Sequence, residues 1–238
     1  MANTVSSLIL RFAGPAQSWG SGGQLYTAVV QTEQTPTESG VLGLLACCLG
    51  AHKKQWPTWV EHGTRVWVRV DRPGEVRTDY QTGNGVPEEM AGHFARSVFA
   101  ERGKGTVPLV ATSTGGAYNI SQRKYLANAE FIVAIEHDDH LDDLVAAVTA
   151  PVFMPYLGRK AFSPTFPFLL GVSEASAVEV LAEMPSSTDP PRSGSADEVV
   201  TLEVYPVKTD RNTLFDNVTV PVTSRKEQLQ WASSHLSR

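Results

Sequence analysis

The first fifty residues predict a β-loop-α unit, which limits the folds open to this chain more than any other feature. Residues 8–12 have the apolar character of a buried strand, and Gly14-Pro15 ends it. Residues 41–49 carry apolar side chains at the spacing of a buried helix, and Gly50 follows its last turn. Between them lie polar side chains, an aromatic ring and the N–H groups of a helix start, which suit a phosphate backbone and a stacked base.

The elements that follow predict a β-α-β-β-α-β order. Residues 65–70 alternate as in a strand, residues 129–136 form an apolar strand, and Leu141–Thr149 has the apolar stripe of a helix. Between the two strands, residues 76–80 and 122–126 could pair as the stem of a long hairpin. We therefore expect an α+β, ferredoxin-like domain with an inserted hairpin, a plan that also underlies sheet-surface RNA binders.

The end of the chain predicts a β-rich extension. Further strands are expected at residues 178–181, 199–205 and 215–222, and a loose helix from residue 227 onward. We therefore place the ferredoxin-like domain at residues 1–175, its hairpin insertion at about 77–123, and the C-terminal extension at 176–238.

Charge is distributed unevenly along the chain, whose formal net charge is −5. Residues 1–125 hold 12 Lys/Arg against 9 Asp/Glu, and residues 126–238 hold 8 against 16. This suits a protein with one basic working face, although two ordinary solvated faces explain the charges equally well. No run approaches the roughly 18 apolar residues of a membrane span, so we expect no membrane contact. Because Cys47 and Cys48 are adjacent in an apolar helix, we expect them to be buried thiols in a reducing cytoplasm.

Residue types used in catalysis and metal binding occur without the spacing that those functions need. Ser18 follows a faint nucleophile-elbow pattern, but no helix follows it directly. The histidines match no zinc-binding motif, and His137 and His140 lie three apart in an acidic, solvated run. We therefore expect no catalytic residue, no metal and no cofactor. One alternative stays open, in which His93, His52 or a tyrosine serves as the base of a metal-independent endoribonuclease.

A basic turn at residues 156–160 combines an aromatic ring, a glycine and two cations. These groups favour contact with phosphates and stacked bases. Further cations populate the insertion and its stem: Arg72, Arg77, Arg96, Arg102, Lys104, Arg123 and Lys124. They predict a finger laid along a polyanion, unless they serve only to keep a disordered loop soluble.

Four segments, in order, resemble the CasD family, subunits of the type I-E CRISPR Cascade complex. They are residues 10–20 (LRFAGPAQSWG), 36–46 (PTESGVLGLLA), 123–129 (RKYLANA) and 155–160 (PYLGRK). The similarity runs from residue 8 to about residue 170, roughly two thirds of the chain. Each motif is weak by itself, but their joint occurrence is specific.

The resemblance implies a repeat-associated, RRM-like (RAMP) fold in a ribonucleoprotein complex for antiviral and anti-plasmid defence. Such subunits hold the 5′ handle of the CRISPR RNA, cap one end of a filament of CasC subunits and contact the large CasA subunit. Target DNA is then a partner through the complex. The insertion at 77–123 would be the thumb that presses on the guide RNA. Family members often carry a basic residue where Glu38 stands, so position 38 is not expected to touch a phosphate.

The residue types and the resemblance together give our candidates for RNA contact: Arg11, Gln17, Ser18, Trp19, Ser39, Gly40, Arg77, Arg123, Tyr156, Gly158, Arg159 and Lys160. The family is regarded as non-catalytic, because a separate subunit, CasE, cuts the precursor RNA. In the related type I-C system the corresponding subunit cuts with Tyr, His and Lys residues, but no spacing groups such residues here. We therefore favour an RNA-binding subunit over an endoribonuclease.

Overall fold

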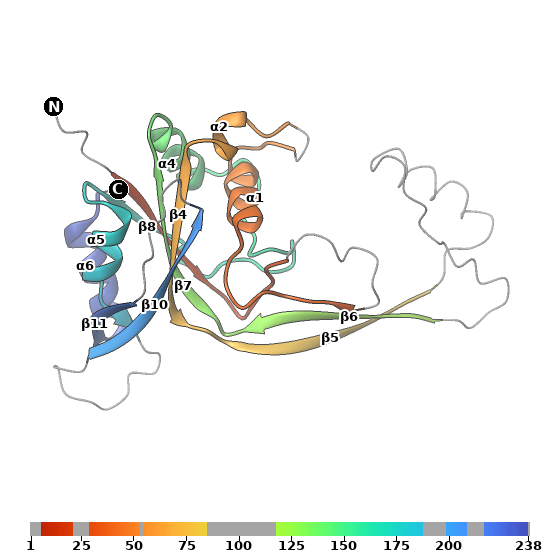
Figure 1. Cartoon of the computed structure of the whole chain (residues 1–238). Coiled ribbons are helices and arrows are strands. Elements are labelled where there is room, and N and C mark those ends of the chain that lie inside the picture. The colour runs from red at the N-terminus through yellow and green to blue at the C-terminus, as the bar shows by residue number, and fades with distance from the viewer. Residues whose placement is uncertain are drawn as a thin grey trace.

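The computed structural model describes residues 6–20, 29–52, 55–84, 118–187, 199–208 and 217–237. Most of these residues build a curled seven-stranded sheet with helices on both faces, and a long hairpin extends from one corner of it (Figure 1). The strand order in the sheet is β8-β1-β7-β4-β10-β11-β9.

Four strands form one half of this sheet: β1 (Ser7–Ala13), β4 (Thr64–Arg72), β7 (Glu130–His137) and β8 (Leu169–Ser173). They are antiparallel, with β1 between β7 and β8 and with β4 on the other side of β7. In the chain, α1 (Glu38–Cys48) follows the first strand and α4 (Leu141–Thr149) follows the third. The strands and helices predicted from residue 8 to residue 149 are therefore confirmed at these positions.

Helices α1 and α4, with the short α2 (Thr58–Glu61), cover what we call the first face of the sheet. Every second residue of β1 (Leu8, Leu10 and Phe12) packs there, in a core shared with Leu45 of α1 and Leu144 of α4. Helix α1 begins at Glu38, because the Thr37 side chain before it accepts a hydrogen bond from the N–H of Gly40.

Helices α5 (Ala177–Glu183) and α6 (Arg225–His235) cover the opposite, second face (Figure 1). The strand predicted at residues 178–181 is wrong, because these residues belong to α5. Ser176 and Glu179 form a reciprocal capping box at its start, which satisfies backbone N–H groups that a helix would otherwise leave open. The helix then buries Val180 and Leu181 against the sheet.

Strands of the C-terminal region widen the same sheet: β10 (Val199–Lys208), β11 (Asn217–Thr223) and β9 (Ser186–Ser187). Strand β10 pairs with β4 and with β11, so the C-terminal region continues the sheet that the N-terminal residues begin. The strands predicted at 199–205 and 215–222 are confirmed over the described residues, and the predicted terminal helix is α6.

The hairpin consists of β5 (Glu75–Asn84) and β6 (Tyr118–Ala127), which pair over their whole length. Val76 pairs with Leu126 and Tyr80 with Gln122, so the predicted stem is confirmed. Two short strands, β2 (Ala16–Gln17) and β3 (Val29–Val30), pair with the other edge of β6. The remainder of the predicted insertion, with Arg96, Arg102 and Lys104, lies outside the described residues.

Among the described residues, helices cover both faces of the β8-β1-β7-β4 half of the sheet, so this half offers no open face for stacked bases, unlike an open-sheet RNA binder. In β10 and β11, the side chains that point away from α5 and α6 are exposed. Within the described ranges, no helix is long and apolar enough to cross a membrane.

Candidate nucleic-acid interface

Two of the predicted motifs, the turn after β1 and the basic turn at 156–160, pack directly against each other. The N–H of Ser18 donates to the carbonyl of Leu157 at 3.0 Å. Gly158 has a φ of +86°, and a Cβ at this position would lie 1.6 Å from the Ser18 carbonyl oxygen. Position 158 therefore requires glycine both for its backbone angle and for this close approach. The role of Gly158 is thus to join the two motifs.

The basic turn is also tied to strand β6 of the hairpin. The guanidinium Nη2 of Arg159 donates to the carbonyl of Lys124 at 3.0 Å, and the Ser18 hydroxyl reaches the same oxygen at 3.4 Å. The Arg159 Cζ lies 5.7 Å from the ring centre of Phe162, whose ring lies beside that of Tyr125 at 5.9 Å. These contacts fix the turn at the base of the hairpin.

Gln17 and Trp19 form a buried support beneath the turn. The Gln17 amide donates to the carbonyls of Phe12 and Ala129 at 3.0 and 2.8 Å, and it accepts from the Trp19 indole at 3.2 Å. The Trp19 ring is 0% exposed and stacks on Phe12 at 5.6 Å. A fully buried ring offers no face to a base, so both side chains hold the turn in place instead of touching RNA.

Gly40 and Ser39 lie in the first turn of α1, next to this support. A Cβ on Gly40 would lie 2.7 Å from the Trp19 ring, and its N–H is already used by the Thr37 cap at 3.3 Å. Gly40 therefore serves packing and capping. Ser39 is exposed, so it remains available for contact.

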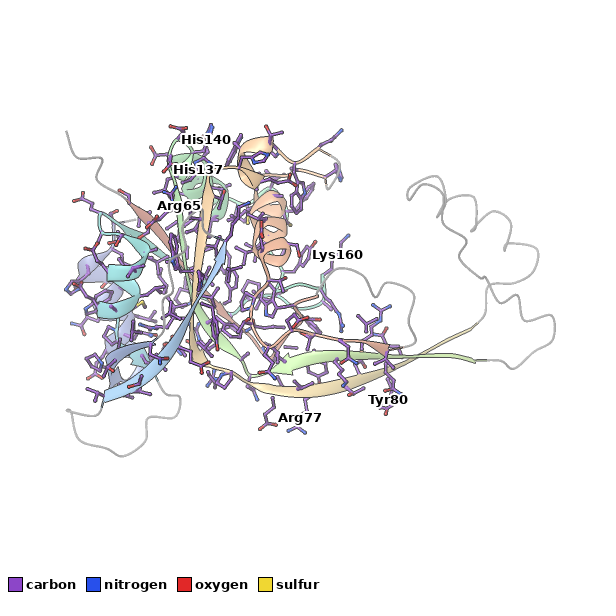
Figure 2. All side chains as sticks on the ribbon, viewed as in Figure 1. Arg65, Arg77, Tyr80, His137, His140 and Lys160 are labelled. Carbon is purple, nitrogen blue, oxygen red and sulfur yellow. The ribbon has the colours of Figure 1, made fainter. Side chains whose placement is uncertain are left out.

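The charges of Arg123 on β6 and Arg159 in the basic turn lie close enough to interact. With their chain neighbours Lys124 and Lys160 they form what we call the basic cluster. Burial lowers the pKa of Arg159, and the nearby charge of Arg123 lowers it further, whereas Asp79 acts in the opposite direction. The Nε of Arg123 is buried with no hydrogen-bond partner among the described residues. Lys160 is exposed and lies between α1 and the hairpin (Figure 2). Repulsion between Arg123 and Arg159 favours a bound anion.

The remaining candidates lie around this cluster or away from it. Tyr156 is half-buried, and burial raises the pKa of its phenol. Arg77 is exposed on β5, where its charge is paired with Glu75. Arg11 is buried on the second face and ion-paired with Glu130 at 2.8 Å, so it does not belong to the basic cluster.

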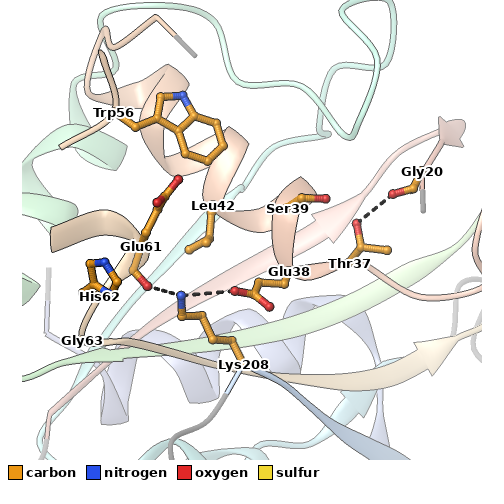
Figure 3. A pocket seen from close by; sticks show the side chains of 10 residues that line it. All are labelled: Gly20, Thr37, Glu38, Ser39, Leu42, Trp56, Glu61, His62, Gly63 and Lys208. Carbon is orange, nitrogen blue, oxygen red and sulfur yellow. Dashed lines mark hydrogen bonds and ion pairs between the residues drawn. The ribbon is translucent and has the colours of Figure 1, made fainter. Parts of the chain in front are cut away.

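Sequence reasoning missed Lys208, the last residue of β10. Its Nζ lies 3.2 Å from the Glu38 carboxylate and donates to the carbonyl of Glu61, in an open pocket of ≈790 Å³ beside the start of α1 (Figure 3). Glu38 thus has its own cation, supplied from a distant strand. No local signal could reveal it, because 170 residues separate the two side chains in the sequence.

The histidines considered for catalysis or metal binding lie at different places in the described part of the chain or outside it. His52 is exposed and contacts the Phe153 ring, and His93 lies outside the described residues. His137 and His140 lie at the end of the sheet away from the hairpin, where the Nδ1 of His137 accepts the N–H groups of Asp139 and His140 (Figure 2). Among the residues that the structure describes, no three His, Cys, Asp or Glu side chains converge to hold a metal.

The fold and the assembled motifs define a CRISPR-associated protein. Residues 7–227 match the family described as CRISPR-associated protein (Cas_Cas5), and the chain belongs to this family. A curated relative, the CRISPR system Cascade subunit CasD of Escherichia coli strain K12, is 31% identical over 185 residues, which cover 72% of this chain and 73% of CasD. The similarity to CasD subunits that the four motifs indicate is therefore confirmed.

Two solved structures of CRISPR-associated proteins also superpose on this chain. A chain of a CRISPR RNA-guided surveillance complex superposes with a TM-score of 0.65 at 26% identity, covering 96% of this chain and 99% of that one. A crystal structure of a Cas protein superposes with a TM-score of 0.53 at 27% identity, covering 93% and 96% of the two chains. The mixed α/β architecture with its curled sheet is thus shared with Cas proteins.

Proposed function

We propose that this protein is the non-catalytic subunit of a type I-E Cascade complex that holds the 5′ handle of the CRISPR RNA. In this role it caps one end of the CasC filament and contacts CasA, and it meets target DNA through the complex. The observation that carries the proposal is the basic cluster at the junction of two family motifs and the hairpin. Its supports, Gly158 and the buried Gln17 and Trp19, are motif residues as well.

The chemistry of the basic cluster supports RNA as the ligand. Arg123, Lys124, Arg159 and Lys160 offer charge for phosphates, and Tyr156 beside them offers a partly exposed ring for a base. Ser39 and Arg77 would widen the contact surface on either side. The hairpin would serve as the thumb that lies along the guide RNA.

We further infer a ferredoxin-like RAMP core at residues 1–175, with a C-terminal extension at 176–238 packed on it, in a protein of the cytoplasm. The strand order β8-β1-β7-β4, with helices after the first and third strands of the chain, supports this inference. The pairing of β10 with β4 supports an extension that is packed on the core and not separate from it.

The test is retention of CRISPR RNA by the complex assembled with the other Cascade subunits. We expect Lys160→Ala and Arg159→Gln to weaken RNA retention and to reduce the salt slope of binding by about 0.7 for each lost phosphate contact. Lys226→Gln is the matched control, because it removes one exposed cation from α6, on the second face. Retention equal to that of this control in both variants would contradict the proposal.

Catalysis is tested by incubating the purified chain with labelled repeat RNA in EDTA and separating the products on a denaturing gel. We expect the RNA to bind and to stay intact. Cleavage at one repeat position would instead support the endoribonuclease, and His93, His52 and the tyrosines would be the first residues to replace.

A further inference from the structure

A second group of cations surrounds one buried carboxylate, that of Glu130 at the start of β7. Arg11 Nε lies 2.8 Å from its Oε1, Arg72 Nη2 lies 3.2 Å from its Oε2, and Arg225 Nη2 lies 2.5 Å from its Oε1. We call these three arginines and Glu130 the arginine cluster. Three guanidinium groups share one carboxylate, so the cluster carries a net charge of +2.

The neighbouring carboxylates that could balance this charge are engaged elsewhere. Asp71, next to Arg72, binds the Arg69 guanidinium at 2.7 and 2.9 Å. Glu227, two residues after Arg225, accepts hydrogen bonds from Ser224 in the capping box of α6. Within the described residues, the excess positive charge of the arginine cluster therefore has no protein counterion.

Water compensates this charge poorly, because most of the cluster is buried. The side chains of Arg11 and Arg225 are 9% and 16% exposed, and the Nε atoms of Arg72 and Arg225 are buried without a partner among the described residues. Burying charge without a counterion is costly. The Arg72 side chain is 41% exposed, so an anion can reach the cluster through it. Guanidinium groups match phosphate oxygens in shape and charge.

The arginine cluster lies at the corner where the hairpin leaves the sheet. Arg72 is the last residue of β4, Glu75 begins β5, and Arg72 and Ala13 both pair with Glu130 in the sheet. Its side chains point to the second face, because Arg11 and Glu130 lie two residues from Ile9 and Ile132, which pack there. The arginine cluster and the basic cluster thus both lie toward the end of the hairpin that joins the sheet. The arginine cluster points to the second face, whereas the basic cluster belongs to β6 and the basic turn.

We propose that Arg11, Arg72 and Arg225 bind one phosphodiester group of single-stranded RNA at the base of the hairpin. This inference rests on the proposed function and extends the RNA path beyond the basic cluster to the second face. The partly exposed Arg72 guanidinium would donate hydrogen bonds to the phosphate oxygens. The buried guanidinium groups of Arg11 and Arg225 would add positive charge beneath it. Glu130 holds the three guanidinium groups in place and leaves the net charge positive.

The test measures binding of labelled single-stranded repeat RNA to the assembled complex from 50 to 200 mM salt. We expect Arg72→Gln to make the loss of affinity over this range about threefold smaller, because one single-strand phosphate contact adds about 0.7 to the slope of log K against log salt. Lys226→Gln is the matched control, since it removes a cation next to Arg225 that does not touch Glu130. The control should keep the wild-type slope.

A second variant, Arg72→Lys, keeps the test decisive if Arg72→Gln does not fold. It keeps the charge and should keep the slope, while the lost fork geometry weakens affinity at every salt concentration. If RNA binds the wild type and Arg159→Gln weakens it, but Arg72→Gln and Arg72→Lys both match the control, the arginine cluster is structural and this inference is overturned. If the wild type binds no repeat RNA, the proposed function itself fails.

Discussion

Helices pack against the two faces of the seven-stranded sheet in different ways. On the first face, Leu8, Leu10 and Phe12 meet apolar side chains of α1 and α4. On the second face, Ile9 and Ile132 meet α5 and α6, but charged side chains are buried among them. The first face is held mainly by the hydrophobic effect, whereas the second combines it with hydrogen bonds and ion pairs of buried charged side chains.

Helix α5 illustrates the second arrangement. The Glu136 carboxylate accepts the N–H of Ala177 at 2.8 Å at the start of the helix. At the other end, the fully buried Arg69 donates to the carbonyls of Leu181 and Met184 at 2.8 and 2.5 Å. A carboxylate at the N-terminus and a guanidinium at the C-terminus complement the helix dipole and satisfy open backbone groups. Polar residues can therefore close a sheet face when each has a partner.

The largest loss of stability should follow the removal of Arg69 from the second face. Arg69→Ala removes the partner of buried Asp71 and the donor to the end of α5, so we expect a loss of about 3–5 kcal/mol in the free energy of unfolding. Urea unfolding measures it. Arg77→Ala, which removes the exposed pair with Glu75 on the hairpin, should cost less than about 1 kcal/mol. Equal losses in the two variants would contradict this account.

On the apolar side, Leu45→Ala should cost about 3 kcal/mol, because it leaves a cavity beneath α1. The same urea experiment at pH 7 and pH 5 should give the same loss, since no ionisable group is removed. A loss that changes with pH would indicate that the first face depends on charge after all.

A smaller, pH-dependent effect should follow Glu130→Gln. Burial raises the pKa of Glu130, but the hydrogen bonds and charges of Arg11 and Arg225 outweigh it and hold the pKa below its ordinary value. The carboxylate therefore stabilises the fold above the ordinary carboxyl range, and this stabilisation is lost as the pH falls through the lowered pKa.

We expect Glu130→Gln to lose about 1–3 kcal/mol at pH 7, a typical worth for hydrogen bonds to a charged group. Thermal unfolding of the variant and the wild type from pH 7 to pH 3 checks the sign. The gap between their melting temperatures should narrow toward acid, and a gap that widens would contradict the lowered pKa.

The smallest effect concerns the thiols of α1. Burial raises the pKa of Cys48 to about 12. Burial also raises the pKa of Cys47, and the charge of Lys160 opposes that rise. In the native protein at pH 8, a chromogenic disulfide reagent should label Cys47 slowly and Cys48 after unfolding. Lys160→Ala should slow labelling of Cys47 slightly. Faster labelling would show that Lys160 shields the thiol and does not activate it.

The first face could be predicted well from the sequence, and the second could not. Alternation in β4 and the apolar spacing of α1 indicate buried surfaces directly. In contrast, Val178–Leu181 was assigned to a strand from its residue types, because propensity does not reveal the capping box that starts α5. The burial of Arg11 could not be predicted either, because its partner Glu130 lies 119 residues away in the sequence.

In the candidate site, too, the sequence does not reveal which side chains are buried or which distant residues they contact. The basic turn and the turn after β1 could be chosen from their residue types, and the structure brings them together. It also buries Gln17 and Trp19, which a sequence-based interpretation cannot distinguish from exposed polar and aromatic groups. Lys208 and Arg225 could not be found, since each acts through a partner contributed by a distant strand or helix.

The place of β1 in the sheet has a consequence for synthesis on the ribosome. Its partners on both sides, β7 and β8, are made more than a hundred residues later. The first strand to be translated thus has neither of its partners while the hairpin strands β5 and β6 are being made. Such long-range pairing slows folding and exposes strands to aggregation. Newly made chains should therefore depend on chaperones until β8 has emerged.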